Sequence, residues 1–334
     1  FFKIVKVLML STLIIFLFNL ICVLKNGFEK RNHFSKIVIN TYKTLEYGEI
    51  TQNGLNCRNR LGDKGFCIFN ETPDNIGDIV LVGDSLTDAL LGNLIDQVSG
   101  TKFRLIQMNY SGNLYLPNFV KFNKKEKKIF ADESWHEFRK DYLKNNTNKN
   151  SYIIFYGDYN YYFEKRLKIS KDKIVEYETH SLFAERNNIN LDYDYRKKLL
   201  KEKIEEALKE ISKDKKVILV YPSPAAPVHI LQHITKKKGE ISKNSDFYLK
   251  DKINYSKNYY REYYSDIIEL FDKINLNNVY KIKLEEVFCP QKKCIFYDNE
   301  NAYIFDTQHP SYEGSKMINN LIMQKINKIE TRSN

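Results

Sequence analysis

The chain lacks the motifs by which nucleotide-binding and nucleic-acid-binding proteins are usually identified. Its 334 residues include only 13 glycines and 7 prolines, and no glycines are grouped as a phosphate-binding loop. No segment matches a nucleic-acid-binding motif, and no segment repeats along the chain. These absences leave no sign of a nucleic-acid partner, and they exclude a repeat architecture.

Acidic residues are fewer than basic residues. The chain has 53 Lys and Arg against 42 Asp and Glu, which gives a net charge of +11. Much of the excess comes from lysine-rich stretches such as 121–128 and 236–238. A basic excess is compatible with nucleic acid, anionic lipid or acidic polysaccharide, and equally with a solvated surface. We favour the solvated surface and predict no nucleic-acid partner.

One long apolar run lies near the start of the chain. Val7–Leu24 is interrupted by only three polar residues, which makes it long enough to cross a bilayer. No small-residue cleavage site follows, so residues 1–25 are predicted to form a membrane-spanning helix instead of a cleaved signal peptide. Basic residues are more frequent after the run, which taken alone places the remainder in the cytoplasm. The chain opens with Phe1, which is compatible with the C-terminal part of a longer membrane protein; if other helices precede this one, they would set the orientation instead.

Cysteine is scarce, with five residues. Cys22 lies in the apolar run, and the other four form two close pairs, Cys57 with Cys67 and Cys289 with Cys294. Such pairs in a secreted domain usually form disulfides, which favours an outward-facing domain. A zinc site is the alternative, but the ten-residue step of the first pair fits zinc spacings poorly. We therefore predict two disulfides and no metal.

The remaining chain is predicted to form an α/β domain. It is 43% hydrophobic, enough for one large or two modest domains. Residues 26–77 are interpreted as a juxtamembrane linker or extension, and 78–334 as a domain with alternating strands and helices. Such alternation predicts a parallel sheet covered on both faces. The predicted strands are 79–82, 103–108, 152–156, 217–221 and 279–282, and the predicted helices are 86–98, 195–211, 255–274 and 312–326.

Two short segments carry the residues of a hydrolytic site. Ser85 follows the buried strand Ile79–Val82, on a strand-to-helix turn that exposes its hydroxyl. A serine needs a base within hydrogen-bond reach, and the base needs an orienting partner. His309 is the candidate base and Asp306, three residues earlier, the candidate partner. We predict a Ser85–His309–Asp306 triad at the carboxyl end of the first strand.

These segments resemble the blocks of the SGNH (or GDSL) hydrolase superfamily. The stretch IVLVGDSLTDAL (79–90) is similar to its first block and FDTQHPSYEGS (305–315) to its last. The resemblance implies a flavodoxin-like, three-layer fold. Three features make the chain most similar to SGNH domains fused C-terminally to acyltransferase family three membrane proteins. They are the upstream apolar run, the stretch VILVYPSPAAP (217–227) and the cysteine pair before the last block.

The resemblance also implies an oxyanion hole. Its backbone donors would be the N–H groups of Ser85 and Gly112, the latter in a Ser-Gly pair after the second strand. The family's third donor is an asparagine soon after a glycine at the third strand's end. Here Asn160 is displaced from that spacing, and an ionised Asp158 cannot donate. We predict Asn160 as the third donor, with Asp158 turned toward a lysine or a tyrosine.

The resemblance implies serine-dependent O-acyl transfer, mostly O-acetyl transfer, to a bacterial surface glycan. The acyl donor would be delivered by a membrane acyltransferase module of the same or a separate chain, with no cofactor. The domain would face outward from the membrane, in the periplasm or outside the cell. A membrane-anchored carbohydrate esterase would share the acyl-enzyme, and a catalytically silent glycan-binding module is the alternative of a different class.

Overall fold

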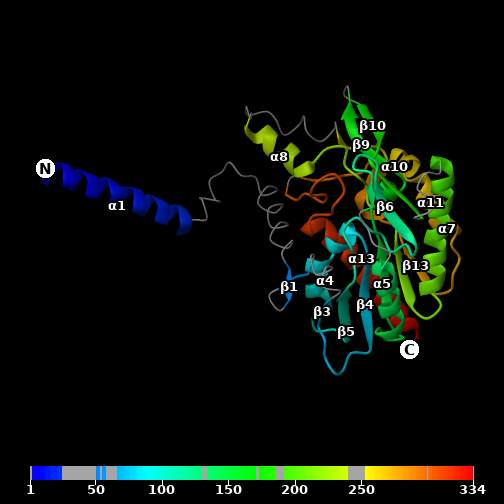
Figure 1. Ribbon diagram of the computed structural model, residues 1–334. Coiled ribbons are helices and arrows are strands. Elements are labelled where there is room, and N and C mark those ends of the chain that lie inside the picture. Colours follow the sequence, from blue (N-terminus) through cyan, green and yellow to red (C-terminus); the bar gives the residue numbers. More distant parts are fainter. Residues whose placement is uncertain are drawn as a thin grey trace.

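A six-stranded sheet forms the centre of the protein, whose structure is a computed structural model (Figure 1). The strands follow the spatial order β13-β12-β8-β4-β5-β3. Their bounds are Cys67–Phe69 (β3), Gly77–Gly83 (β4), Phe103–Gln107 (β5), Tyr152–Tyr156 (β8), Lys216–Val220 (β12) and Val279–Ile282 (β13). The structure describes residues 2–24, 50–52, 55–57, 66–129, 134–170, 173–185, 192–239, 253–298 and 300–333.

Five strands of this sheet, β4, β5, β8, β12 and β13, are parallel and follow the flavodoxin-like order. The chain runs from β4 to β5 on one side and then returns to β8 on the other side of β4. The carboxyl end of β4 therefore lies at the point where the strand order reverses, the usual place for a site in such a sheet. All seven residues of β4 are buried, which fits the apolar run Ile79–Val82 at its centre.

Helices cover both faces of the sheet, as predicted. Figure 1 shows α4 (Leu91–Val98) and α13 (Tyr312–Ser333) on one side, and they contact each other. The helices α5 (Ser134–Asn145), α7 (Tyr193–Ile211) and α11 (Ser265–Lys273) cover the other side. This division follows from right-handed crossovers between parallel strands. The predicted three-layer α/β architecture is confirmed.

The prediction of a wholly parallel sheet is wrong at one edge. β3 pairs antiparallel with β5, and it comes from the segment that we interpreted as a juxtamembrane extension. Two predicted helices are also interrupted. The first divides into α3 (Ser85–Asp88) and α4, and the other into α10 (Lys257–Tyr263) and α11.

Two long connections contain strands that the sequence analysis missed. β6 (Phe119–Asn123) pairs with β7 (Lys128–Ile129) and β11 (Ser181–Glu185) in a second sheet. β9 (Lys165–Ser170) and β10 (Lys173–Glu178) form an antiparallel ribbon, in which charged residues dominate. The remaining elements are short: β1 (Thr51–Gln52), β2 (Leu55–Asn56), α6 (Tyr159–Tyr162), α8 (Ile230–Gly239), α12 (Glu285–Phe288) and the 3₁₀-helix η5 (Pro290–Lys292).

The apolar run near the start of the chain is helical, as α1 (Phe2–Leu24). Within the residues that the structure describes, no helix is both long and apolar enough to cross a membrane. The predicted membrane span over residues 1–25 is therefore not confirmed. Most of the predicted extension, residues 26–49 included, lies outside the described residues.

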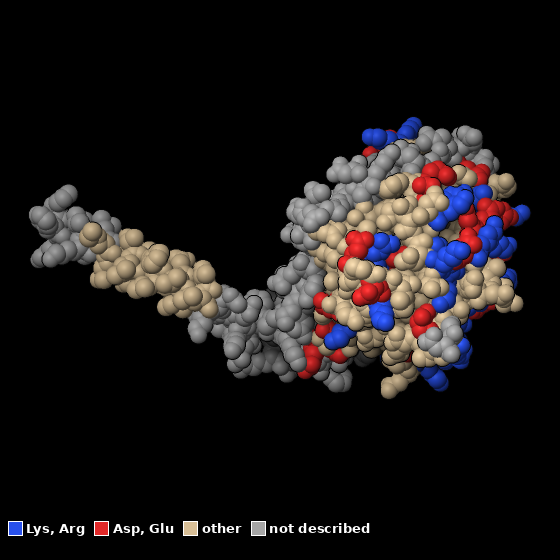
Figure 2. Space-filling view, turned by 90° about the horizontal axis from the view of Figure 1, so that it is seen from below, with Lys and Arg blue, Asp and Glu red and all other residues tan. Residues whose placement is uncertain are grey.

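Charges of both signs lie side by side on the face of the protein drawn in Figure 2. Ion pairs between side chains at the surface of the described residues include Lys140 with Glu210 at 3.0 Å and Lys209 with Glu205 at 2.8 Å. Exposed pairs of this kind contribute little to stability but keep a surface solvated. This face fits the solvated surface that we favoured from the composition.

Both predicted disulfides are present. Cys57–Cys67 joins the segment after β2 to the edge strand β3. Cys289–Cys294 closes the turn that contains η5, and the Cys294 N–H donates to the Tyr255 carbonyl at 2.9 Å. The second bridge thus fixes the segment that leads to Asp306 and His309.

We expect the double substitution Cys289→Ala/Cys294→Ala to lower the free energy of unfolding by about 2 kcal/mol, because a short closed loop is released in the unfolded state. Urea denaturation of the purified oxidised protein measures this change. Wild-type protein in reductant, which loses both bridges, should lose more. An unchanged unfolding midpoint in the double variant would contradict the expectation.

Candidate active site

Ser85, His309 and Asp306 lie in a hydrogen-bonded row at the carboxyl end of β4. The Ser85 Oγ is 2.8 Å from the His309 Nε2, and the His309 Nδ1 is 2.7 Å from the Asp306 Oδ2. Ser85 is the first residue of α3, whereas the other two lie on the loop before α13. The fold therefore brings together the three residues predicted as a triad, in the order nucleophile, base and orienting acid.

The loop from Phe305 to His309 is shaped by the Asp306 side chain. Its Oδ1 accepts the backbone N–H groups of Gln308 and His309, each at 2.8 Å. The Phe305 N–H donates to the His309 carbonyl at 2.8 Å and closes the turn. A second segment supports the loop, because the Ile230 N–H donates to the Asp306 carbonyl at 3.0 Å. One carboxylate thus folds the loop with one oxygen and orients the imidazole with the other.

The charges of this pair favour a basic histidine. Burial opposes the imidazolium form of His309, but the hydrogen bond and the charge of Asp306 outweigh it and raise the pKa above its ordinary value of 6.5. Burial likewise opposes ionisation of Asp306. Its hydrogen bonds and its attraction to His309 hold the pKa of that carboxyl well below its usual range. The Asp306 carboxylate therefore stays ionised beside the His309 imidazole.

A second carboxylate, that of Asp84, connects the turn that carries Ser85 to neighbouring segments of the protein. Asp84 is 1% exposed. Its Oδ1 accepts the Leu86 N–H at 2.9 Å, and its Oδ2 accepts the Asp158 N–H and the Tyr162 hydroxyl, each at 2.8 Å. The Tyr162 hydroxyl oxygen in turn accepts the Leu114 N–H at 2.7 Å. Asp84 therefore links the ends of β4 and β8 to the loop after β5.

The electrostatic environment of Asp84 differs from that of Asp306. Burial raises the pKa of the Asp84 carboxyl, and the negative charge of Asp158 adds to the effect. The hydrogen bonds from the Asp158 and Leu86 N–H groups and from Tyr162 oppose the shift. Asp84 is thus held by hydrogen bonds, without the support of a directly contacting cation among the described residues.

Glycine is required immediately before Asp84. A Cβ at Gly83 would lie 1.9 Å from the Tyr156 carbonyl oxygen and 2.0 Å from the Thr87 Oγ1. These two atoms are hydrogen-bonded to each other at 2.6 Å, so neither is free to move away. The absent side chain lets β4, β8 and the first turn of α3 approach closely enough to place Ser85 at the sheet edge.

Two backbone N–H groups near the triad have no hydrogen bond to a described residue. They belong to Ser85 and Gly112, the two residues predicted as backbone oxyanion donors. Gly112 adopts φ +70° in the turn between Tyr110 and Asn113, a conformation that favours glycine. Both groups are thus available to an oxygen of a bound molecule.

The prediction that Asn160 supplies a third oxyanion donor does not fit the structure. Asn160 is 2% exposed, and its Nδ2 donates to the Tyr263 carbonyl of α10 at 2.9 Å. The physical reason is that α6 begins at Tyr159 and turns Asn160 into the protein interior. The Asp158 carboxylate is turned away to a partner, as predicted. That partner is Arg166, at 2.5 Å, and not the predicted lysine or tyrosine.

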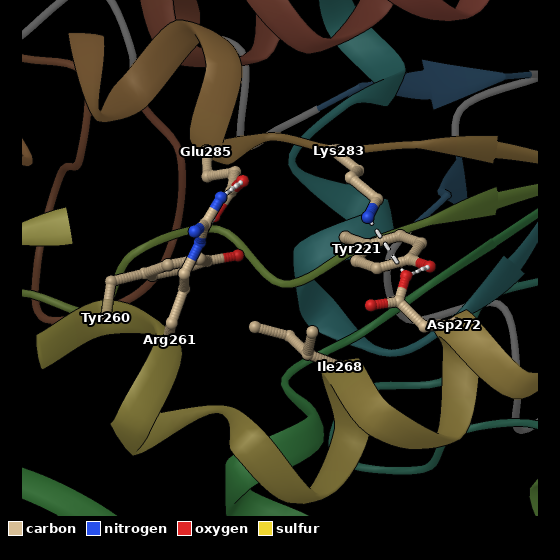
Figure 3. A pocket seen from close by; sticks show the side chains of 7 residues that line it. All are labelled: Tyr221, Tyr260, Arg261, Ile268, Asp272, Lys283 and Glu285. Atoms are coloured by element: carbon tan, nitrogen blue, oxygen red, sulfur yellow. Dashed lines mark hydrogen bonds and ion pairs between the residues drawn. The ribbon is translucent and has the colours of Figure 1, made fainter. Parts of the chain in front are cut away.

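A cavity of about 310 Å³ lies between α10, α11 and the ends of β12 and β13 (Figure 3). Arg261 pairs with Glu285 at 2.7 Å on one side, and Lys283 pairs with Asp272 at 2.9 Å on the other. The Tyr221 hydroxyl also donates to Asp272, at 2.7 Å. The charged groups are thus satisfied by one another, and the triad residues do not line this cavity. Across the described ranges, no cluster of three or more potential metal ligands is present.

Comparison with known proteins agrees with the α/β fold described above. The family model "SGNH domain (fused to AT3 domains)" matches residues 53–324. The periplasmic domain of the Salmonella ser. Paratyphi A lipopolysaccharide acetyltransferase superimposes with a TM-score of 0.51 at 17% identity, covering 86% of this chain and 96% of that domain. The acetyl xylan esterase AlAXEase gives a TM-score of 0.38 at 16% identity, covering 74% and 98%. No curated protein sequence matches the chain.

Replacement of the orienting acid should change the titration of His309. In Asp306→Asn, the charge that raises the His309 pKa is lost while burial remains, so we expect the pKa to fall below 6.5. In the wild type, activity that needs neutral His309 should rise with pH through an inflection above 6.5. NMR titration of the imidazole nitrogens measures both pKa values. Equal values in the two proteins would refute the assigned role of Asp306.

Replacement of the buried Asp84 carboxylate should cost stability. Asp84→Asn puts an amide N–H against at least one of the donors that the two carboxylate oxygens accept, so we expect the free energy of unfolding to fall by about 2–3 kcal/mol. Asp88→Asn, in the same helical turn, retains an acceptor for Gln107 and is the matched control, with a loss below about 1 kcal/mol. Equal losses in the two variants would remove Asp84 from its linking role.

Proposed function

The chain belongs to the family of SGNH domains that are fused to AT3 domains, and from this premise we propose that it transfers acyl groups, chiefly acetyl, to hydroxyl groups of a bacterial surface glycan. The observation that carries the proposal is the position of His309, with one ring nitrogen on Ser85 and the other on Asp306. This arrangement favours a working nucleophile over a silent binding module.

The first half of the reaction forms an acyl-enzyme. His309 Nε2 accepts the proton of the Ser85 hydroxyl as the Oγ attacks the carbonyl carbon of the donor. The carbonyl oxygen becomes negatively charged and receives the N–H groups of Ser85 and Gly112. When the tetrahedral intermediate collapses, the donor's leaving group departs with the proton from His309. The acyl group is then joined to the Ser85 Oγ.

The second half transfers the acyl group to the acceptor. A sugar hydroxyl approaches the acyl carbon and gives its proton to His309 as the new ester bond forms. Collapse of the second tetrahedral intermediate releases the acylated sugar and returns the proton to the Ser85 Oγ. If water replaces the sugar, the same steps release a free acid, and the domain acts as an esterase.

The family description supports a membrane partner. We propose that an AT3 acyltransferase module, in the same or a separate chain, supplies the acyl donor, and that the domain faces outward from the membrane. The two disulfides favour such an oxidising compartment. At 17% identity, the likeness to the lipopolysaccharide acetyltransferase domain supports the fold alone. It does not identify lipopolysaccharide as the acceptor of this chain.

We expect Ser85→Ala to reduce hydrolysis of p-nitrophenyl acetate by about 10³-fold or more, because the nucleophile is removed and only binding remains. Ser99→Ala, at the exposed end of α4, is the matched control and should keep the wild-type rate. A fluorophosphonate probe should label the wild type and the control but not Ser85→Ala. Full turnover in purified Ser85→Ala protein would overturn the proposal.

The choice between transferase and esterase is tested with the same proteins. An added acceptor oligosaccharide should receive acetyl groups at the expense of free acetate, as measured by mass spectrometry of the sugar. Hydrolysis that is unaffected by every surface glycan tried, in a protein that still needs Ser85, would favour the esterase.

A further inference from the structure

A fully buried arginine contacts both segments that carry the backbone N–H groups of the site. Arg139 of α5 is 0% exposed. Its Nη1 lies 3.5 Å from the carbonyl oxygens of Gly83 and Met108, and its Nη2 lies 3.4 Å from that of Leu114. Gly83 precedes the nucleophile turn, and the other two residues stand on either side of Gly112. One guanidinium therefore joins the two halves of the candidate oxyanion hole.

This cation is held without a carboxylate in direct contact. Among the described residues, no acidic side chain forms an ion pair with Arg139, and its Nε has no hydrogen-bond partner. Burial lowers the pKa of Arg139 to about 10. Such a charge is costly to bury, and an apolar side chain of similar size would often be tolerated equally well. A contribution to stability is therefore a weak explanation for Arg139.

A neutral histidine orients the guanidinium. The His136 Nδ1 lies 2.9 Å from the Arg139 Nη2. Burial lowers the pKa of His136 well below its ordinary value, and the charge of Arg139 adds to the effect. The ring is therefore neutral and accepts with Nδ1. The guanidinium also lies 5.3 Å from the centre of the Tyr115 ring, which limits its movement further.

The charges around Ser85 explain why a cation is useful at this place. Besides the Asp306 carboxylate of the triad, two carboxylates lie near His309, and one of them, that of Asp158, has a cationic partner in Arg166. Asp84 has hydrogen bonds alone, and its negative charge would oppose an oxyanion that forms on the neighbouring Ser85. Asp84 is one of several groups whose charge opposes the fall of the Arg139 pKa on burial, so the guanidinium and this carboxylate attract each other.

We infer that Arg139 is a positioning residue of the acyl-transfer site. It holds the carbonyls of Gly83, Met108 and Leu114 so that the N–H groups of Ser85 and Gly112 meet at the acyl oxygen. The inference rests on the proposed function, since it assigns Arg139 to the oxyanion of that reaction.

The direct test is Arg139→Met, which removes the charge and keeps the volume. We expect kcat for p-nitrophenyl acetate to fall by about 10–100-fold with little change in KM, because the contact matters for the transition state. The thermal unfolding midpoint should stay unchanged or rise, because a buried charge is removed. Fluorophosphonate should still label Ser85, but more slowly. A wild-type kcat or a wild-type labelling rate in Arg139→Met would overturn the inference.

A second arginine, on a strand of the central sheet, provides the matched control. Arg104 of β5 pairs with Asp78 at 2.8 Å, and Asp78 lies at the end of β4 opposite to Ser85. Arg104→Met should lose stability and keep kcat, which is the reverse of the pattern for Arg139→Met. An equal loss of kcat in both variants would reduce Arg139 to a structural role.

Two further comparisons protect the test. If Arg139→Met does not fold, Arg139→Lys replaces it, because lysine keeps the charge but lacks the planar guanidinium. The kcat of Arg139→Lys should lie below that of the wild type. A wild-type kcat would again overturn the inference. Ser85→Ala separates this question from the proposed function. Activity in Ser85→Ala would overturn the proposed function, whereas full activity in the Arg139 variants alone would overturn only the present inference.

Discussion

The geometry of the site depends on the hydrogen bonds that the buried carboxylate of Asp84 accepts. A carboxylate removed from water must find hydrogen-bond donors, and here they come from the start of α3 and from the segment between Asp158 and Tyr162. The Leu86 N–H fixes the start of α3, and the Asp158 N–H fixes the end of β8. Tyr162 connects the same oxygen to Leu114, beyond the turn that contains Gly112. The position of Ser85 relative to both neighbouring strand ends follows from these bonds.

The triad and the central strands could be predicted from the sequence, because both depend on local patterns. Buried parallel strands such as β8 are continuous apolar runs, and its predicted bounds agree with the structure. Ser85 and His309 had to approach each other once a parallel sheet with its site at the carboxyl ends was assumed. The disulfides followed from the short separations within each cysteine pair.

Other features depend on side-chain directions that a sequence does not reveal. Asn160 was expected at the oxyanion hole, but one helical turn directs it to Tyr263. Arg139 lies in a helix whose sequence is dominated by polar residues, so nothing in the pattern separates it from the exposed lysines nearby. β3 was missed because three residues at a sheet edge give too short a pattern, and its pairing with β5 is visible only in the fold.

The central claim is that Ser85 carries the acyl group between donor and acceptor. The most direct measurement is peptide mass spectrometry of protein that has been mixed with p-nitrophenyl acetate and quenched rapidly in acid. The account predicts one acetyl group on the peptide that contains Ser85, which disappears when an acceptor sugar is added before the quench and reappears on that sugar. Turnover of the ester without an acetyl group on Ser85 at any time, or with the group on another residue, would contradict it.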